Sequence, residues 1–174
     1  MASGKIEKFN LLELANRDAC FDLQFRKDTR HERTGSPTYY RWKLQFVITG
    51  PKDSVKIMER IEKEFGCGDV STTAGQARFS VQKIDDIYET IVPYFTKNVL
   101  TQTPSTSLRA SKKKDFDLWR KAVEIIYKNK GKYLAAWEKN DLKKLIEIHK
   151  TKSKYKQKPR AGKWMSMAQA LARS

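Results

Sequence analysis

The order strand–strand–helix occurs twice in this chain, and it restricts the possible folds more than any other feature. Residues 21–26 and 39–49 alternate between apolar and polar side chains, which is typical of strands with one buried face. Apolar residues at helical spacing then begin at Val55, and Gly66 is a suitable helix stop. This first unit therefore predicts two paired strands followed by a helix.

The second unit has the same order. Residues 69–73 and 77–82 predict a hairpin, and the apolar spacing that starts at Ile84 predicts a helix that Pro93 interrupts near its end. A short helix over residues 9–19 precedes the first unit, and further helical stripes follow the second. The order is α-β-β-α-β-β-α, so we expect an α+β fold in which helices pack on one face of an antiparallel sheet.

The charge balance points to a polyanionic partner. The 174 residues include 36 Lys and Arg against 20 Asp and Glu, a formal net charge of +16. The surplus positive charges repel one another in the folded state, which a polyanionic partner would relieve. The basic residues alternate with aromatic residues in the expected strands and in the C-terminal segment, and this pattern favours nucleic acid as the partner. A solubility device or a membrane-surface patch is the alternative. No segment has the length of a transmembrane helix, and we expect no membrane partner.

The C-terminal segment carries half of this charge. Residues 150–174 contain six Lys, two Arg and no acidic residue, which gives +8. We therefore divide the chain into a domain over residues 1–149 and a basic arm over residues 150–174. Trp164 among cationic residues suits stacking on unpaired bases, and such arms become ordered on RNA. The alternative for residues 164–171 is a short amphipathic helix that docks on protein.

Side-chain alternation separates the two faces of the expected sheet. Apolar residues of the strands, such as Leu23 and Phe46, point to the core, and the opposite face then carries Arg, Lys, Gln and Tyr. Arg and Lys suit phosphates and guanine, and Gln suits adenine. A solvated sheet face without function is the alternative. The residues that we expect to contact nucleic acid are Gln24, Arg26, Tyr39, Arg41, Lys43, Gln45, Arg78, Gln82, Lys112, Lys113, Lys114, Lys154, Lys156, Lys158, Arg160, Lys163 and Trp164.

Several segments together suggest a family. Residues 11–21, LLELANRDACF, resemble the LAGLIDADG motif of homing endonucleases in a degenerate form. Further segments resemble single-motif members in the same order: RWKLQF, FGCGDV, RFSV, IVPYF, KKKDFDLW and LKKLIEIH. The resemblance covers residues 8–150. It implies an α-β-β-α-β-β-α core, dimers joined through the motif helices, and curved sheets that lie in the DNA major groove.

The resemblance also implies where an active member would hold its chemistry. Asp18 stands at the position of the metal ligand, and we expect it to be catalytic, with Mg²⁺ as the cofactor, only if the protein is active. Active relatives place a Gln at the end of the second strand, where this chain has Thr49-Gly50. Their Lys near the end of the third helix has two sets of counterparts here, Lys97 and residues 112–114.

The motif itself departs from the family pattern at two positions. Its third and seventh residues are small in relatives, because the two helices pack closely, but here they are Glu13 and Arg17. Charged groups enter a tight seam only at a cost of several kcal/mol. We therefore expect a dimer to be disfavoured, although a crossed Glu13–Arg17 pair could form if the helices separated.

These observations lead to two main hypotheses. The first is a non-catalytic RNA-binding protein without a cofactor, such as an organellar ribosomal protein or intron-splicing cofactor with protein neighbours in a ribonucleoprotein. The alternative is an active, homodimeric, Mg²⁺-dependent DNA endonuclease, and a DNA-binding regulator without cleavage is a third reading. Because members of the resembled family occur in organelles and bacteria, we expect the protein to be located in a mitochondrion or plastid, with the bacterial cytoplasm as the alternative.

Overall fold

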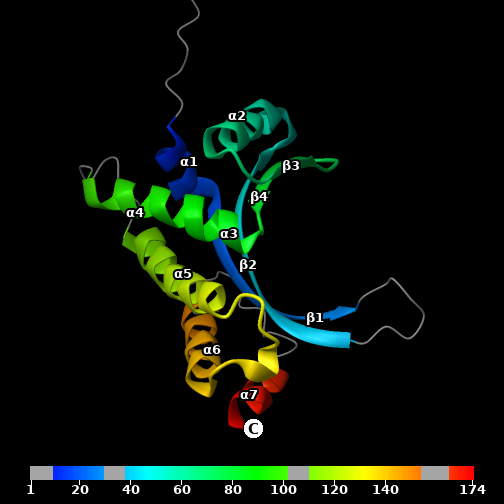
Figure 1. Cartoon of the computed structure of the whole chain (residues 1–174). Helices are drawn as coiled ribbons and strands as arrows, with labels where there is room; N and C mark the ends of the chain where they lie inside the picture. Colours follow the sequence, from blue (N-terminus) through cyan, green and yellow to red (C-terminus); the bar gives the residue numbers. More distant parts are fainter. Residues whose placement is uncertain (1–9, 30–37, 102–109, 154–164) are drawn as a thin grey trace, which may run out of the picture.

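The computed structural model describes residues 10–29, 38–101, 110–153 and 165–174 (Figure 1). Their strands are β1 (Ala19–Thr29), β2 (Thr38–Pro51), β3 (Asp69–Thr72) and β4 (Gln76–Val81). Their helices are α1 (Leu11–Asp18), α2 (Val55–Phe65), α3 (Ile84–Asp86), α4 (Val92–Thr101), α5 (Ala110–Lys128), α6 (Lys139–Ser153) and α7 (Met165–Arg173). Short helical turns are η1 (Lys52–Ser54), η2 (Ile87–Ile91) and η3 (Leu134–Ala136).

The four strands form one antiparallel sheet in the order β1-β2-β4-β3. In the β1–β2 pair, Phe21 lies opposite Phe46 and Gln24 lies opposite Lys43. This register keeps the apolar residues of both strands on one face, as the alternation predicts. The predicted α+β order of helices and strands is confirmed.

Helices cover the apolar face of the sheet, with η2, α4 and α5 stacked beside one another in Figure 1. Phe21 lies at the centre of this core, and its ring centroid is 5.2–5.4 Å from those of Phe46, Phe95, Phe116 and Trp119. Each aromatic ring removes a large apolar area from water, so this cluster fixes the helices on the sheet.

The helix around Pro93 is continuous, although the sequence predicts an interruption there. The chain runs from α3 through η2, a π-helical turn, into α4, and Pro93 is the second residue of α4. A proline lacks the N–H that an α-helix would use and its ring crowds the carbonyl four residues earlier. The wider π turn just before it accommodates both effects, which explains why the helix does not break.

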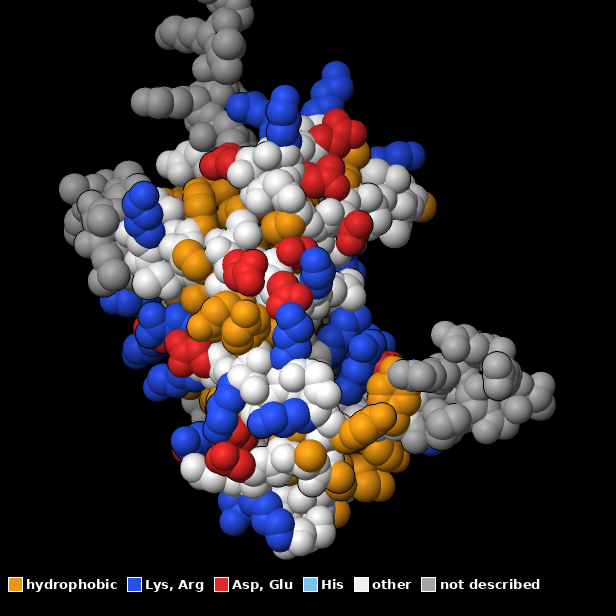
Figure 2. Space-filling view, viewed as in Figure 1, with side chains coloured by type: hydrophobic (Ala, Val, Ile, Leu, Met, Phe, Trp, Pro, Cys, Tyr) orange, Lys and Arg blue, Asp and Glu red, His pale blue; other side chains and the backbone are white. Residues whose placement is uncertain are grey.

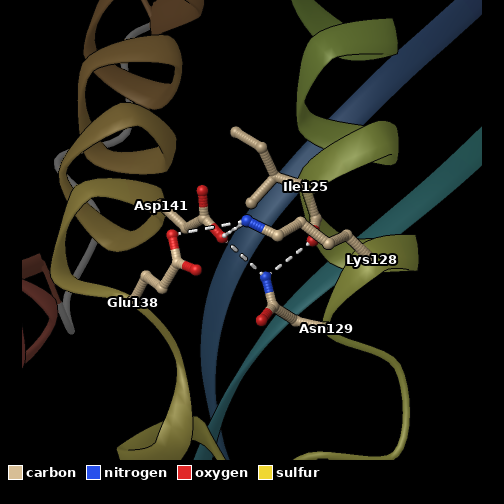
Figure 3. A network of polar contacts seen from close by, with 5 residues as sticks. All are labelled: Ile125, Lys128, Asn129, Glu138 and Asp141. Carbon is tan, nitrogen blue, oxygen red and sulfur yellow. Dashed lines mark hydrogen bonds and ion pairs between the residues drawn. The ribbon is translucent and has the colours of Figure 1, made fainter.

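The turn between α5 and α6 is held by a compact polar network (Figure 3). Asn129, which is buried, donates its side-chain N–H to the carbonyl of Ile125 at 2.9 Å and to Asp141 Oδ2 at 2.9 Å. Lys128 Nζ lies 3.0 Å from the same carboxylate oxygen. Burial raises the pKa of Asp141, but these two donors outweigh it, so the pKa lies below its ordinary value.

The C-terminal segment differs from the expected free arm. Helix α6 continues through Ser153, past the predicted boundary at residue 150, and α7 packs against α6 with Ala168 and Ala172 buried. Residues 165–171 therefore follow the alternative, a docked amphipathic helix, because small residues on one side of α7 allow close packing. Residues 154–164 lie outside the described part. No helix among the described residues is long and apolar enough to cross a membrane.

Candidate nucleic-acid interface and active site

One face of the sheet points away from the helices. This outer face carries Gln24 and Arg26 of β1 and Arg41 and Lys43 of β2. Arg26 lies opposite Arg41, Gln24 opposite Lys43 and Asp22 opposite Gln45. Tyr39 and Gln82 are exposed, as are Arg26 and Arg41, while Gln24, Lys43, Gln45 and Arg78 are half-buried. The parity of the strands therefore placed these residues correctly, and their contact with nucleic acid stays a prediction.

The cations of the outer face repel one another. Partial burial lowers the pKa of the Lys43 ammonium, and the charges of Arg26, Arg41 and Arg78 lower it further, whereas Asp28 acts in the opposite direction. A site in which like charges destabilise the protonated form gains free energy when an anion binds.

Two carboxylates of the same face limit this charge. Asp28 forms an ion pair with Arg41, and Asp22, only 6% exposed, accepts a hydrogen bond from the side chain of Gln24. Asp28 therefore offsets part of the Arg41 charge, and the remaining N–H groups of the half-exposed guanidinium stay open to a phosphate. The Arg41–Asp28 pair joins two strands and the Gln24–Asp22 pair lies within one strand. The sequence prediction named Gln24 and Arg41 but did not identify either pair.

The charges on the helical side are more evenly mixed. Figure 2 shows Lys and Arg side chains over α5 and α6 with Asp and Glu side chains among them. A groove between these helices is lined by both signs, including Lys121, Glu124, Lys144 and Glu147. The outer face thus remains the stronger candidate for a polyanion, because acidic groups compete with phosphate on the helical side.

The motif helix α1 ends at one end of the sheet. Asn10 caps it by accepting hydrogen bonds from the backbone N–H groups of Leu12 at 3.1 Å and Glu13 at 3.3 Å. Leu11, Leu12 and Ala15 are buried, and the chain passes from Asp18 directly into β1. The Asp18 side chain is 24% exposed, and its Oδ2 lies 2.8 Å from Nε of Arg17.

A lysine from a distant helix reaches this point. Lys112, in the first turn of α5, donates a hydrogen bond from Nζ to the backbone carbonyl of Ala19, the residue after Asp18. Lys97, Lys113 and Lys114 are exposed. Among the possible counterparts of the family lysine, Lys112 is the one with a hydrogen bond to the residue after Asp18, and its correspondence to that lysine stays a prediction.

Two further contacts hold α5 in this position. Trp119 donates its ring N–H to the carbonyl of Asp22 at 2.9 Å, which ties α5 to β1. Lys152 of α6 is 3% exposed and forms an ion pair with Asp115, three residues after Lys112. Lys152 was assigned to the basic arm from the sequence, but its ammonium group holds two helices together.

The end of β2 also lies near Asp18. Ile48 pairs with Ala19, so Thr49 is at the same end of the sheet, and it pairs with Arg78 on the outer face. A Cβ atom at Gly50 would lie 3.2 Å from Met58 Cε and from Ser54 Oγ. A longer side chain at residue 50 would thus crowd Met58 of α2 and Ser54 of η1, which would have to shift. A Gln like that of active relatives would not fit at this position without such a shift.

A single chain does not form a metal centre within its described residues, which contain no group of three His, Cys, Asp or Glu side chains able to hold a metal ion. Asp18 contributes one carboxylate, and Arg17 contacts it. A divalent cation at this position would therefore need further ligands from outside the described chain. The predicted nucleic-acid contacts Lys154, Lys156, Lys158, Arg160, Lys163 and Trp164 lie outside the described residues.

Comparison with known proteins decides the family. The sequence profile of the LAGLIDADG endonuclease family matches residues 14–123, more than half of the chain. The chain belongs to the LAGLIDADG endonuclease family. A curated relative, the "Probable intron-encoded endonuclease 3" of Neurospora crassa, is 33% identical over 72 residues, which are 40% of this chain. The match spans only 14% of that relative's length.

Solved structures with the same fold are LAGLIDADG-type homing endonucleases. The homing endonuclease I-TnaI has a TM-score of 0.64 at 17% identity, with 92% of this chain and 94% of that one covered. The archaeal intron-encoded homing endonuclease I-Vdi141I, complexed with DNA, has a TM-score of 0.67 at 15% identity, with 93% and 91% covered. At these identities the likeness confirms the fold of this family member.

Proposed function

We propose that this LAGLIDADG protein binds double-stranded DNA with its outer face and cleaves it only when two copies act together. The observation that carries the proposal is the contact of Lys112 with the carbonyl next to Asp18, at one end of the sheet. A cation 93 residues after Ala19 in sequence is thereby held at the backbone that directly follows Asp18, the one retained acidic residue of the motif.

DNA is the preferred partner over RNA for two reasons. I-Vdi141I is complexed with DNA, and another structure of the same fold, I-LtrWI, is bound to its target DNA. The RNA hypothesis rested on a long basic arm, and the last part of that arm is helix α7, packed on α6. A DNA-binding role without cleavage is the second candidate, because Thr49-Gly50 stands where active relatives place a Gln.

Cleavage would require two copies, because one chain supplies a single acidic residue at this site. Two-metal phosphodiester hydrolysis needs several oxygen ligands around Mg²⁺. Two copies related by a two-fold axis would supply two Asp18 carboxylates and two Lys112 ammonium groups. The outer faces of both copies would then lie along one DNA duplex.

The first experiment selects bound sequences from a randomised DNA duplex library and incubates them with Mg²⁺. We expect enrichment of a long, near-palindromic site and cleavage of both strands within it. Asp18→Asn should retain binding and lose cleavage, and Asp53→Asn, the same change at an exposed position of η1, should behave like the native chain. Enrichment without cleavage would leave a DNA-binding regulator, and no enrichment at all would refute the proposal.

The second experiment tests the outer face. Arg26→Ala with Lys43→Ala should lower the affinity for the selected duplex and reduce the slope of log affinity against log salt by about 1.8 for each bound chain, hence about 3.6 for two chains on one duplex, because each lost phosphate contact removes about 0.9. The control is Lys56→Ala with Lys63→Ala, two exposed lysines on α2. Equal losses in both variants, or tighter binding to single-stranded RNA, would contradict the DNA interface.

A further inference from the structure

The outward side of α1 carries two opposite charges one helical turn apart. Glu13 and Arg17 are both exposed, whereas Leu11, Leu12 and Ala15 on the other side are buried. Residues four positions apart lie on the same side of a helix, about 6 Å apart along its axis. Glu13 and Arg17 thus form an exposed strip that carries one negative and one positive charge.

Arg17 already has a contact inside its own chain. Its Nε lies 2.8 Å from Asp18 Oδ2, but the Arg17 side chain is 72% exposed. Ion pairs that exposed contribute little to stability, since water screens them. The guanidinium group can therefore leave Asp18 at little cost when a better carboxylate is offered.

A second copy of this chain offers such a carboxylate. In a two-fold symmetric pair, a contact between residue 13 of one copy and residue 17 of the other occurs twice, once in each direction. Glu13 and Arg17 have opposite charge, so both crossed contacts are attractive, like the charged side chains that flank a coiled-coil seam. Charge complementarity thus selects another copy of this chain as the occupant of the strip.

We propose that Arg17 exchanges its own Asp18 for Glu13 of a second copy when two chains assemble through α1. This inference rests on the proposed function, because it explains how assembly frees the Asp18 carboxylate that a single chain keeps neutralised. The charged residues that depart from the family's small ones would then have a use. They would join two copies.

Charge reversal tests the crossed contacts by sedimentation over a concentration series. Glu13→Arg and Arg17→Glu should each weaken self-association by about tenfold or more, since both crossed contacts become repulsive. An equimolar mixture of the two variants should associate again, because every contact between unlike chains is attractive. The double variant with both reversals should associate at least as tightly as the native chain, because both crossed contacts are attractive again and the cation no longer stands beside Asp18. Glu13 lies in the first turn of α1 and Arg17 in the last turn, so each reversal opposes the helix dipole and should slightly lower the thermal stability. The double variant should show the largest fall and yet associate, which separates self-association from stability.

A double-mutant cycle tests the exchange itself. If Asp18 competes for Arg17, Asp18→Asn should tighten self-association severalfold in the native background and by less in an Arg17→Ala background. The difference between the two backgrounds removes any effect of Asp18 that does not pass through Arg17.

Three results would overturn the inference. They are a native chain that stays monomeric at every concentration, a mixture that associates no better than its components, or equal effects of Asp18→Asn in both backgrounds. None of these readouts involves DNA. A protein that assembles as described yet neither binds nor cleaves DNA would refute only the proposed function.

Discussion

Replacing Lys152 with methionine tests whether the ammonium group between α5 and α6 stabilises the fold. Its Nζ is paired with the carboxylate of Asp115 and lies 3.4 Å from the Asp115 carbonyl, and the lysine is 3% exposed. Loss of one partner of a buried ion pair costs about 3–5 kcal/mol. The Asp115 side chain is 25% exposed and can regain water, and methionine keeps most of the apolar contacts of the stem.

We therefore expect Lys152→Met to lower the free energy of unfolding by about 2–3 kcal/mol, at or just below the lower limit of that range. For a chain of this size the loss corresponds to a fall in Tm of about 4–12 °C. Lys143→Met is the matched control, because Lys143 is on the same helix but exposed, and it should change stability by less than about 0.5 kcal/mol. Urea unfolding of the full chain measures both.

Two outcomes would refute this account of Lys152. One is equal stability of the Lys152 and Lys143 variants. The other is an Asp115→Asn change that costs as much in the Lys152→Met background as in the native chain, because coupled partners are not additive. Hydrogen exchange adds a local measure. Amides in the first turns of α5, around Lys112, should lose protection in Lys152→Met before those of the sheet do.

Two further predictions concern the fold. Asp141 has a pKa below its ordinary value of 3.8 in the folded chain, so its contribution to stability is present above that value and is lost as the pH falls through the folded pKa. The stability difference between the native chain and Asp141→Asn should thus be full at neutral pH and shrink below about pH 4 in a series of urea titrations. Gly68 has φ +93°, and a Cβ atom there would lie 2.6 Å from the Phe79 ring, so Gly68→Ala should cost about 2–4 kcal/mol. Gly75→Ala, with nothing within 4 Å, should cost less than about 1 kcal/mol in the same assay, and similar values for both would contradict the steric explanation.

The features that the sequence could predict are those set by local periodicity. Alternation in residues 39–49 identifies which side chains face the core, because a strand has a period of two, and the β1–β2 register agrees with it. Asp18 was singled out differently, by the resemblance of a contiguous motif to a family pattern, and its role stays a prediction. Both depend only on neighbours in the chain.

The features that the sequence could not predict depend on contacts between distant segments. Three consecutive lysines begin at Lys112, and only the packing of α5 on β1 shows which of them reaches Ala19. Lys152 lies in a segment without acidic residues, yet its partner Asp115 comes from 37 positions earlier. The composition of residues 150–174 gives no sign of this pairing, since a buried and a solvated lysine have the same charge.

The bond between Gln24 and Asp22 has a consequence for sequence discrimination. An amide held by a buried carboxylate has one N–H already engaged, so it presents its oxygen and its remaining N–H in one fixed orientation. A side chain that is ordered before binding loses less rotamer entropy when it meets a base edge. If Gln24 contacts a base, Asp22 sets which base it accepts without touching the DNA, and Asp22→Ala would broaden the range of tolerated target sequences more than it weakens binding.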